Sequence, residues 1–282
     1  MNILLTGASG FLGLAISKKV DLNSHTLIRV SRRKLIGFIQ CDLASVSEVQ
    51  QLFDNTNPDL IIHCAAEVPK NIESYNDRSI YHTNTKMVAN LSIDRTIPFV
   101  YISSMTVYGD CKRILYNESD ECFPDSEYAI SKLEGEDYIK EHCDTSIILR
   151  IPGLYSELKK SGLVHNIIMS ILKEKKIELP KDKIQWAAMH VDDAASSIVD
   201  IINSMPKNKT INVGYENKYS INDLIANCNS IFEGNVKCHV EHPEFQFDLN
   251  LLKELSSMPP QLTLKDSLEN MKKYYIGEND VK

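Results

Sequence analysis

Tyrosine and lysine residues stand four positions apart at three places in the chain, a spacing that can support proton transfer. The pairs are Tyr108/Lys112, Tyr128/Lys132 and Tyr155/Lys159. Residues four apart on a helix share one face, so the lysine ammonium can favour the phenolate and lower the tyrosine pKa from its usual value of about 10. Such a tyrosine can give or take a hydroxyl proton when a hydride moves at a carbinol carbon.

The middle pair has the local sequence that this chemistry requires. Tyr128 begins a helical pattern that continues as AISKLEGEDYIK, whereas Tyr108 precedes a Gly-Asp turn and Tyr155 follows a Pro-Gly break. The strand before this helix, YISSMTVYG, brings its serines to the carboxyl edge of a parallel sheet, where ligands bind in open α/β folds. We therefore take Tyr128 and Lys132 as a catalytic pair. No GxSxG sequence is present, which argues against a serine hydrolase.

A glycine-rich turn follows the first strand and predicts dinucleotide binding. One glycine permits the tight turn, one removes the Cβ where a pyrophosphate approaches the backbone, and one lets helix and strand pack closely. The helix N-terminus then presents free N–H groups to the phosphates. A glycine-rich loop without a ligand is the alternative, which the place of the turn in a βαβ run disfavours. The predicted contacts are Gly7, Ser9, Gly10, Phe11, Leu12 and Gly13.

The end of the second strand reads VSRR and lacks the acidic residue that binds the ribose 2′-hydroxyl of NAD in many proteins of this kind. A serine followed by a guanidinium suits a 2′-phosphate instead, because arginine presents a planar fork to phosphate oxygens. The alternative is that the two arginines begin a solvated loop. We predict NADP rather than NAD as the cofactor, bound by Ser31 and Arg32.

Strands and helices alternate through the first half of the chain. This order predicts an α/β fold with a Rossmann-like, doubly wound parallel sheet covered on both faces. Strands are predicted at 2–5, 26–30, 36–39, 59–63, 98–102, 146–150 and 210–214. Helices are predicted at 11–20, 45–54, 73–95, 127–143, 162–175, 190–204, 220–232 and 263–275, with a short strand and loop in 175–186.

Two units follow from this pattern. Residues 1–155 are predicted to form an NADP-binding Rossmann-like domain, to which 188–214 return. Residues 156–187 and 215–282 are predicted to form a smaller α/β substrate-binding lobe.

The GxxGxxG turn, the YxxxK helix and the strand ending in VYG together resemble the extended branch of the short-chain dehydrogenase/reductase superfamily. That branch contains nucleotide-sugar epimerases, dehydratases and reductases. The resemblance covers residues 1–200 well and the remainder weakly. Aligned on VYG, Ser104 takes the family's catalytic serine or threonine position, which implies that it hydrogen-bonds the substrate oxygen. The resemblance also implies that Lys132 contacts the nicotinamide ribose.

Further contacts are implied by the resemblance alone. The HCAA sequence after the fourth strand matches the family's HxAA pattern, and Asn84 matches an asparagine that supports the active site. The implied cofactor contacts, besides Tyr128 and Lys132, are Asp42, Leu43, Cys64, Ala65 and Ala66. Candidate substrate contacts are Glu67, Thr106, Tyr155, His165 and Trp186. For the histidine and the tryptophan, a packing role is the alternative.

Two positions depart from the family and narrow the predicted function. Gly153 replaces an asparagine that commonly contacts the nucleotide diphosphate, and Trp186 replaces an arginine that binds the substrate diphosphate in many epimerases. Reductases of nucleotide-linked 4-keto-6-deoxysugars resemble this chain in being short and in lacking that arginine. We predict such an NADPH-dependent reductase, with Tyr128 as proton donor. The alternatives are an NAD-dependent nucleotide-sugar 4-epimerase and a non-catalytic NADP-binding sensor or scaffold.

Composition excludes several classes of protein. The chain has 282 residues, of which 43% are hydrophobic and 24% charged, and a net charge of −7, as in a globular protein rather than a disordered one. The acidic balance and the lack of a long basic run argue against nucleic acid or a membrane surface as a partner. Seven cysteines without a CxxC pair predict free thiols and no metal site.

Localisation and partners follow from other features. Because the N-terminus shows no leader sequence, we expect a cytoplasmic protein, and we expect it to bind a nucleotide sugar. The resemblance implies a homodimer through the helices at 73–95 and 127–143.

Overall fold

The computed structural model describes seven stretches of the chain, namely 1–70, 73–109, 113–175, 186–216, 220–236, 245–256 and 263–277. The strand and loop predicted in 175–186 lie almost entirely outside the described residues. Lys112, the partner of Tyr108 in one of the three Tyr/Lys pairs, also lies outside them.

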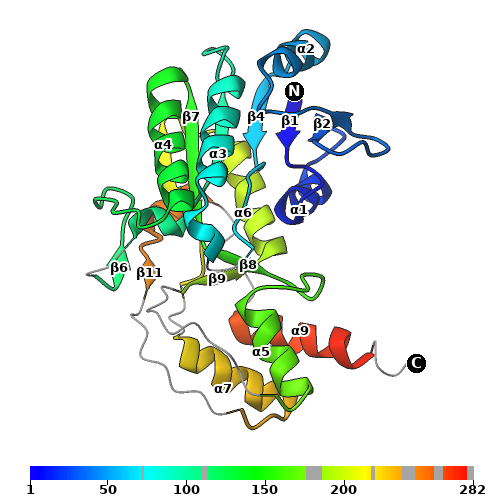
Figure 1. Ribbon diagram of the computed structural model, residues 1–282, viewed down its shortest axis with the longest axis vertical. Coiled ribbons are helices and arrows are strands. Elements are labelled where there is room, and N and C mark those ends of the chain that lie inside the picture. The colour runs from blue at the N-terminus through cyan, green and yellow to red at the C-terminus, as the bar shows by residue number, and fades with distance from the viewer. Residues whose placement is uncertain are drawn as a thin grey trace.

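A seven-stranded parallel sheet forms the upper part of the molecule, with the order β10-β7-β5-β4-β1-β2-β3 (Figure 1). Its strands are β1 (Asn2–Thr6), β2 (Thr26–Ser31), β3 (Ile39–Gln40), β4 (Leu60–His63), β5 (Phe99–Ser104), β7 (Ser146–Ile151) and β10 (Lys209–Asn212). Every residue of β4, β5 and β7 is buried, as continuous apolar runs in a doubly covered sheet require. The predicted Rossmann-like fold is confirmed.

Helices cover both faces of the sheet, and alternate residues of each strand point to them. Leu4, Ile61 and Phe99 pack against α2 (Val46–Thr56), α3 (Arg78–Leu91) and α4 (Glu127–His142). Leu5 and Ile62 face the other side, which α1 (Phe11–Lys19) and α6 (Val191–Ser204) cover. The two apolar layers hold the carboxyl ends of the strands at one edge.

A smaller lobe lies below that edge (Figure 1). It contains the paired strands β8 (Gly153–Tyr155) and β9 (Ala188–His190) and the helices α5 (Leu163–Leu172), α7 (Ile221–Phe232) and α9 (Leu264–Gly277). The three helices share one apolar cluster with Tyr155. We call this unit the C-terminal lobe.

Residues 245–256 do not belong to that cluster, although the sequence assigned them to the lobe. The strand β11 (Gln246–Phe247) pairs with β6 (Leu115–Tyr116), and α8 (Asn250–Leu255) contacts β10. Phe245, Phe247 and Leu252 join the apolar cluster of the sheet. The segment therefore packs on the sheet side, because its aromatic side chains are buried against Tyr108 and Tyr116.

Among the predicted elements, the runs 36–39 and 73–95 differ most from the structure. The apolar run 36–39 yields only the start of β3, because Gly37 takes a positive φ of 78° in a turn that leaves Ile36 fully exposed. The helix predicted over 73–95 is divided into a short 3-10 helix η1 (Glu73–Asn76) and α3. Asp77 separates them, since its side chain caps the N–H of Ser79.

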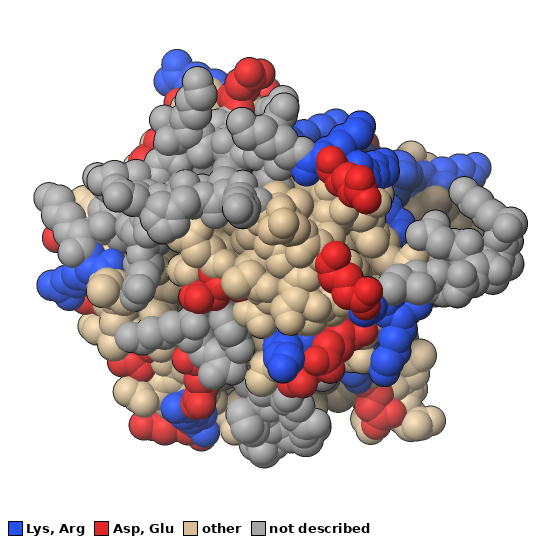
Figure 2. Space-filling view, turned by 90° about the horizontal axis from the view of Figure 1, so that it is seen from below, with Lys and Arg blue, Asp and Glu red and all other residues tan. Residues whose placement is uncertain are grey.

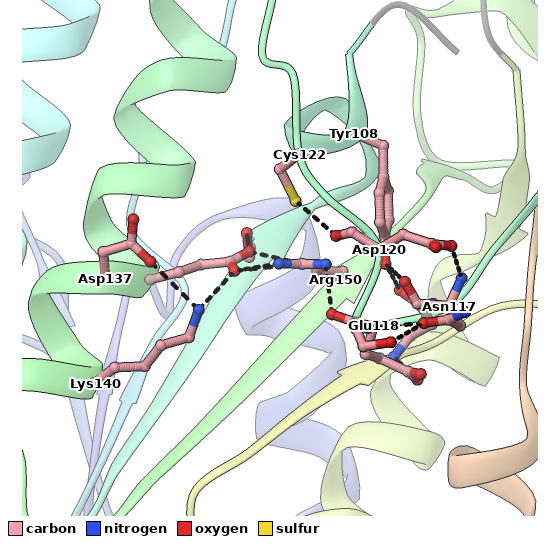
Figure 3. Close-up of polar contacts among 12 residues, drawn as sticks. Tyr108, Asn117, Glu118, Asp120, Cys122, Asp137, Lys140 and Arg150 are labelled. Atoms are coloured by element: carbon pink, nitrogen blue, oxygen red, sulfur yellow. Dashed lines mark hydrogen bonds and ion pairs between the residues drawn. The ribbon is translucent and has the colours of Figure 1, made fainter. Parts of the chain in front are cut away.

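A buried ion pair ties α4 to the sheet. Arg150 Nη2 lies 2.7 Å from Glu136 Oε2, and the two side chains are 4% and 0% exposed. Glu136 also accepts a hydrogen bond from Ser103 Oγ at 2.5 Å. Figure 3 shows Arg150 extending to the carbonyl oxygen of Glu118 and to the ring of Tyr108, which lies 4.8 Å from the guanidinium carbon. The pair thus joins α4, β5, β7 and the segment after β5.

We expect Arg150→Met to destabilise the fold strongly, because it leaves the buried Glu136 carboxylate with only the Ser103 hydroxyl and the more distant Lys140 ammonium as partners. The expected loss in the free energy of unfolding is about 3–5 kcal/mol, measured by urea unfolding. Arg95→Met is the matched control: its pair with Asp144 is exposed, and its loss should stay below about 1 kcal/mol. Equal losses in the two variants would contradict a structural role for the buried pair.

Candidate functional site

A cleft of about 2210 Å³ separates the carboxyl edge of the sheet from the C-terminal lobe. Its volume exceeds the ~300–1,000 Å³ of a cleft for one small ligand, so it has room for a dinucleotide and a second molecule. Figure 2 views the lobe end, where acidic and basic side chains are interspersed around a largely uncharged area. In the described part of the chain, no helix meets the length and hydropathy of a membrane span. Those residues also contain no cluster of His, Cys, Asp or Glu fit for a metal ion.

The cleft gathers nearly all of the predicted site residues. Those that line it are Gly7, Ser9, Gly10, Phe11, Leu12, Gly13, Ser31, Arg32, Asp42, Leu43, Cys64, Ala65, Ala66, Glu67, Ser104, Thr106, Tyr128, Lys132, Tyr155 and Trp186. His165 is the exception: its Nδ1 hydrogen-bonds Tyr275 Oη at 2.7 Å within the lobe. The His165 ring thus packs α5 on α9, the alternative role considered from the sequence, and its contact with a substrate stays a prediction.

The glycine turn has the close contacts that its sequence predicts. Gly7 has a φ of 62°, and a Cβ there would lie 2.6 Å from the backbone nitrogen of Ala65 after β4. A Cβ on Gly13 would lie 2.2 Å from the carbonyl oxygen of Gly7. Gly10 caps α1 without a side-chain hydrogen bond. The turn therefore brings α1 against the strand ends and leaves the start of the helix without side-chain cover.

An arginine and a glutamate meet at the β2 end of the cleft. Arg32 Nη1 lies 2.5 Å from Glu67 Oε1, and the two side chains are 70% and 39% exposed. Ser31 is buried beside them, with its Oγ 3.0 Å from Ser9 Oγ in the glycine turn. The sequence suggested Glu67 as a substrate contact, whereas the structure pairs it with Arg32. A carboxylate thus reaches this end from the loop after β4.

Tyr128, Lys132 and Ser104 come together at the end of β5. Ser104 lies near Tyr128, whose pKa it lowers, and its Oγ accepts a hydrogen bond from Thr106 Oγ1 at 3.0 Å. Lys132 lies one turn further along α4, and its Nζ donates to the carbonyl oxygen of Ile102 at 2.9 Å. The helix and the strand end therefore present a hydroxyl, a phenol and an ammonium to one cleft.

Burial dominates the protonation of these groups. It raises the pKa of Tyr128 above its usual value, and the nearby Tyr75 adds to the rise while Ser104 opposes it. Burial lowers the pKa of Lys132 to about 8. The sequence predicted that Lys132 would lower the pKa of Tyr128; the structure shows the opposite direction, because both groups are desolvated. Tyr128 is therefore a protonated phenol at neutral pH.

Three further residues support the site, of which only Tyr75 was not singled out in the sequence. Asn84, which the resemblance singled out, lies behind the cleft and donates from Nδ2 to Ser131 Oγ at 3.2 Å and to the carbonyl oxygen of Glu67 at 3.1 Å. Tyr75 packs edge-to-face on Tyr128, with ring centroids 5.9 Å apart. Lys159, set aside as a weaker Tyr/Lys match, lines the cleft from the lobe side.

Comparison with known proteins agrees with this geometry. Residues 1–219 match the family described as the RmlD substrate binding domain. Methionine adenosyltransferase 2 subunit beta of Danio rerio is 32% identical over 161 residues, which cover 56% of this chain and 50% of that protein. The chain spans about half the length of the curated relatives it matches.

Solved structures share the whole fold. UDP-glucose 4-epimerase from Thermotoga maritima, solved with UDP-glucose, aligns with a TM-score of 0.83 at 20% sequence identity. The alignment covers 99% of this chain and 100% of the epimerase chain. A dTDP-4-dehydrorhamnose reductase from Clostridium acetobutylicum has a TM-score of 0.81 at 23% identity, covering 98% and 100%. At these identities the likeness shows the fold alone.

The protonation of Lys132 gives a pH-dependent prediction. Below pH ~8 the ammonium is charged in both the folded and the unfolded chain, and its burial costs stability. Between the folded pKa of about 8 and the usual value of 10.5, only the unfolded chain keeps the proton, so rising pH favours the folded state. In urea unfolding, Lys132→Met should therefore be most stable relative to the wild type near pH ~7, with the difference shrinking toward pH ~10.

Lys86→Met, at an exposed lysine of α3, is the control for this series. Its difference from the wild type in the free energy of unfolding should stay the same across this pH range. If the Lys132→Met difference is equally independent of pH, the ammonium is not desolvated in the folded protein.

Proposed function

Since this chain belongs to the RmlD substrate-binding-domain family, we propose that it is an NADPH-dependent reductase of a nucleotide-diphosphate-linked 4-keto-6-deoxysugar. The observation that carries the proposal is that Ser104, Tyr128 and Lys132 line the same cleft as the glycine turn. The sheet edge would bind the cofactor, and the C-terminal lobe would bind the sugar nucleotide. The Cβ-free approach at Gly7 fits a dinucleotide held close to the backbone.

In this mechanism NADPH supplies the hydride to the 4-keto carbon. Tyr128 donates its proton to the carbonyl oxygen, so that the C=O group becomes a secondary alcohol. Ser104 hydrogen-bonds the same oxygen while negative charge develops on it. Its raised pKa keeps Tyr128 protonated until that oxygen becomes the stronger base, and Lys132 then provides a positive charge near the phenolate until solvent returns the proton.

NADP is preferred over NAD because of the side chains at the carboxyl end of β2. Ser31 and Arg32 offer a hydroxyl and a guanidinium, and Arg33 also lines the cleft. Glu67 holds Arg32 at this place and would yield it to a 2′-phosphate, because a dianion attracts the guanidinium more strongly than one carboxylate does.

The substrate prediction is tested by following NADPH absorbance with dTDP-, GDP-, CDP- and UDP-linked 4-keto-6-deoxysugars. We expect oxidation with at least one member and a loss of kcat by about 100-fold or more in Tyr128→Phe, because the proton donor is removed. Tyr81→Phe is the matched control, since this tyrosine bonds Glu134 outside the cleft, and it should keep its activity. No oxidation with any sugar would refute the reductase.

The cofactor prediction is tested with Arg32→Ala. We expect NADPH to bind about 10- to 100-fold more weakly, because the variant loses a charged hydrogen-bond donor. The affinity for NADH should change far less. Binding is measured by titration of each cofactor. Glu67→Gln serves as the companion variant and should bind NADPH at least as tightly as the wild type. Equal losses for both cofactors in Arg32→Ala would contradict a 2′-phosphate site.

A nucleotide-sugar 4-epimerase is the second candidate, favoured by the full-length fold shared with UDP-glucose 4-epimerase. Such an enzyme would retain nicotinamide through purification and interconvert a plain UDP-hexose without net loss of NADPH. The third candidate is a non-catalytic NADP-binding subunit, favoured by relatives named as a subunit of methionine adenosyltransferase. It would bind NADPH, and Tyr128→Phe would leave every assay unchanged. A homodimer through α3 and α4 stays a prediction.

A further inference from the structure

Lys159 is a half-buried cation on the lobe side of the cleft. It lies in the loop between β8 and α5, and its Nζ donates to the carbonyl oxygen of Leu154 at 2.7 Å. The same Nζ lies 5.3 Å from the centroid of the Phe11 ring. Since Phe11 is the first residue of α1, within the glycine turn, the ammonium reaches from the lobe to the turn across the cleft.

No carboxylate neutralises this ammonium among the residues that the structure describes. The acid of the same loop, Glu157, lies 3.3 Å from His190 instead. Burial alone lowers the pKa of Lys159, with no charged group opposing it. An ammonium has three donor hydrogens, and Leu154 accepts only one. Because a desolvated charge is costly without a partner, a cation placed this way fits an anion bound in the cleft.

The surroundings limit what that anion can be. A Cβ built on Gly162 would lie 3.8 Å from Lys159 Nζ, so α5 begins beside the ammonium without a side chain between them. On the other side is the glycine turn, whose backbone suits phosphate oxygens. Trp186, which also lines the cleft, carries no charge.

We propose that Lys159 binds a diphosphate group at the junction of the C-terminal lobe and the glycine turn. The inference rests on the proposed function for the ligand's identity, because NADPH and a nucleotide sugar each carry one diphosphate. The chemistry recognised by Lys159 is the same in both.

The test is calorimetric titration of the wild type, Lys159→Met, Lys159→Arg and the control Lys160→Met. One arm uses NADP⁺, and the other uses dTDP and UDP in the presence of saturating NADP⁺. Lys159→Met should weaken one of the two arms by about 10- to 100-fold, as expected for a lost charged donor. Lys159→Arg should keep most of the affinity, and Lys160→Met should match the wild type, because Lys160 packs on Tyr274 outside the cleft.

The arm that weakens identifies whose diphosphate is bound. Unchanged affinity in both arms overturns the proposal. A wild-type chain that binds neither NADP⁺ nor a nucleoside diphosphate overturns it together with the proposed function. If no sugar is reduced but Lys159→Met still loses binding, the reductase fails and the role of Lys159 stands, since the titration needs no turnover.

Thermal unfolding without ligand separates binding from a structural role. Lys159→Met removes a desolvated charge, so it should unfold at the same temperature as the wild type or higher. A lower unfolding temperature in both Lys159→Met and Lys159→Arg would mean that the hydrogen bond to Leu154 supports the fold, and would overturn the assignment.

Discussion

The buried pair between Glu136 and Arg150 is the constraint on which the site depends. Tyr128, Lys132 and Glu136 follow one another at intervals of four on α4, so a single face carries the proposed proton donor, its cation and the anchor. Glu136 also accepts a hydrogen bond from Ser103, the neighbour of Ser104 on β5. The Glu136 carboxylate therefore fixes the position of α4 along the sheet and also holds the end of β5.

Close packing keeps that face near the sheet. A Cβ on Gly135 would lie 2.5 Å from the hydroxyl oxygen of Tyr101, so α4 approaches β5 at a distance that a larger residue prevents. This close packing also excludes water, so the charged form of an ionisable side chain buried beneath the cleft is disfavoured. Burial lowers the pKa of His63 to about 3, and its neutral ring hydrogen-bonds Thr6 at 2.7 Å. Lys132 is a cation within the cleft, and Arg32 and Lys159 are cations at its edges.

A feature of the fold or the site could be predicted from the sequence when it depends on residues close together in the chain. The glycine turn and the Tyr/Lys pair are local patterns, and the apolar runs of β4 and β7 report burial directly, so the fold and most of the cleft were predictable. Strands β6, β8, β9 and β11 have two or three residues each and exist only through distant partners. Periodicity cannot detect such strands.

The same limit applies to single side chains. Glu67 meets Arg32 across 35 positions of sequence, and Tyr75 meets Tyr128 across more. His165 was a candidate because it lies in the lobe helix near the expected pocket, whereas its partner is Tyr275, 110 positions further along the chain. The predicted pKa of Tyr128 was wrong for a related reason: spacing on a helix reveals which charges are adjacent, but not how much water the fold removes.

The return of residues 245–256 to the sheet has a consequence for how the molecule is made. Phe245 and Phe247 pack on Tyr108, whose hydroxyl donates to Asn212 of β10. A ribosome releasing this chain from its N-terminus would deliver all the strands of the main sheet well before these two aromatic rings emerge. The edge beside Tyr108 therefore stays without these two rings during synthesis until residues 245–247 have left the ribosome, more than thirty residues after the last strand of the main sheet.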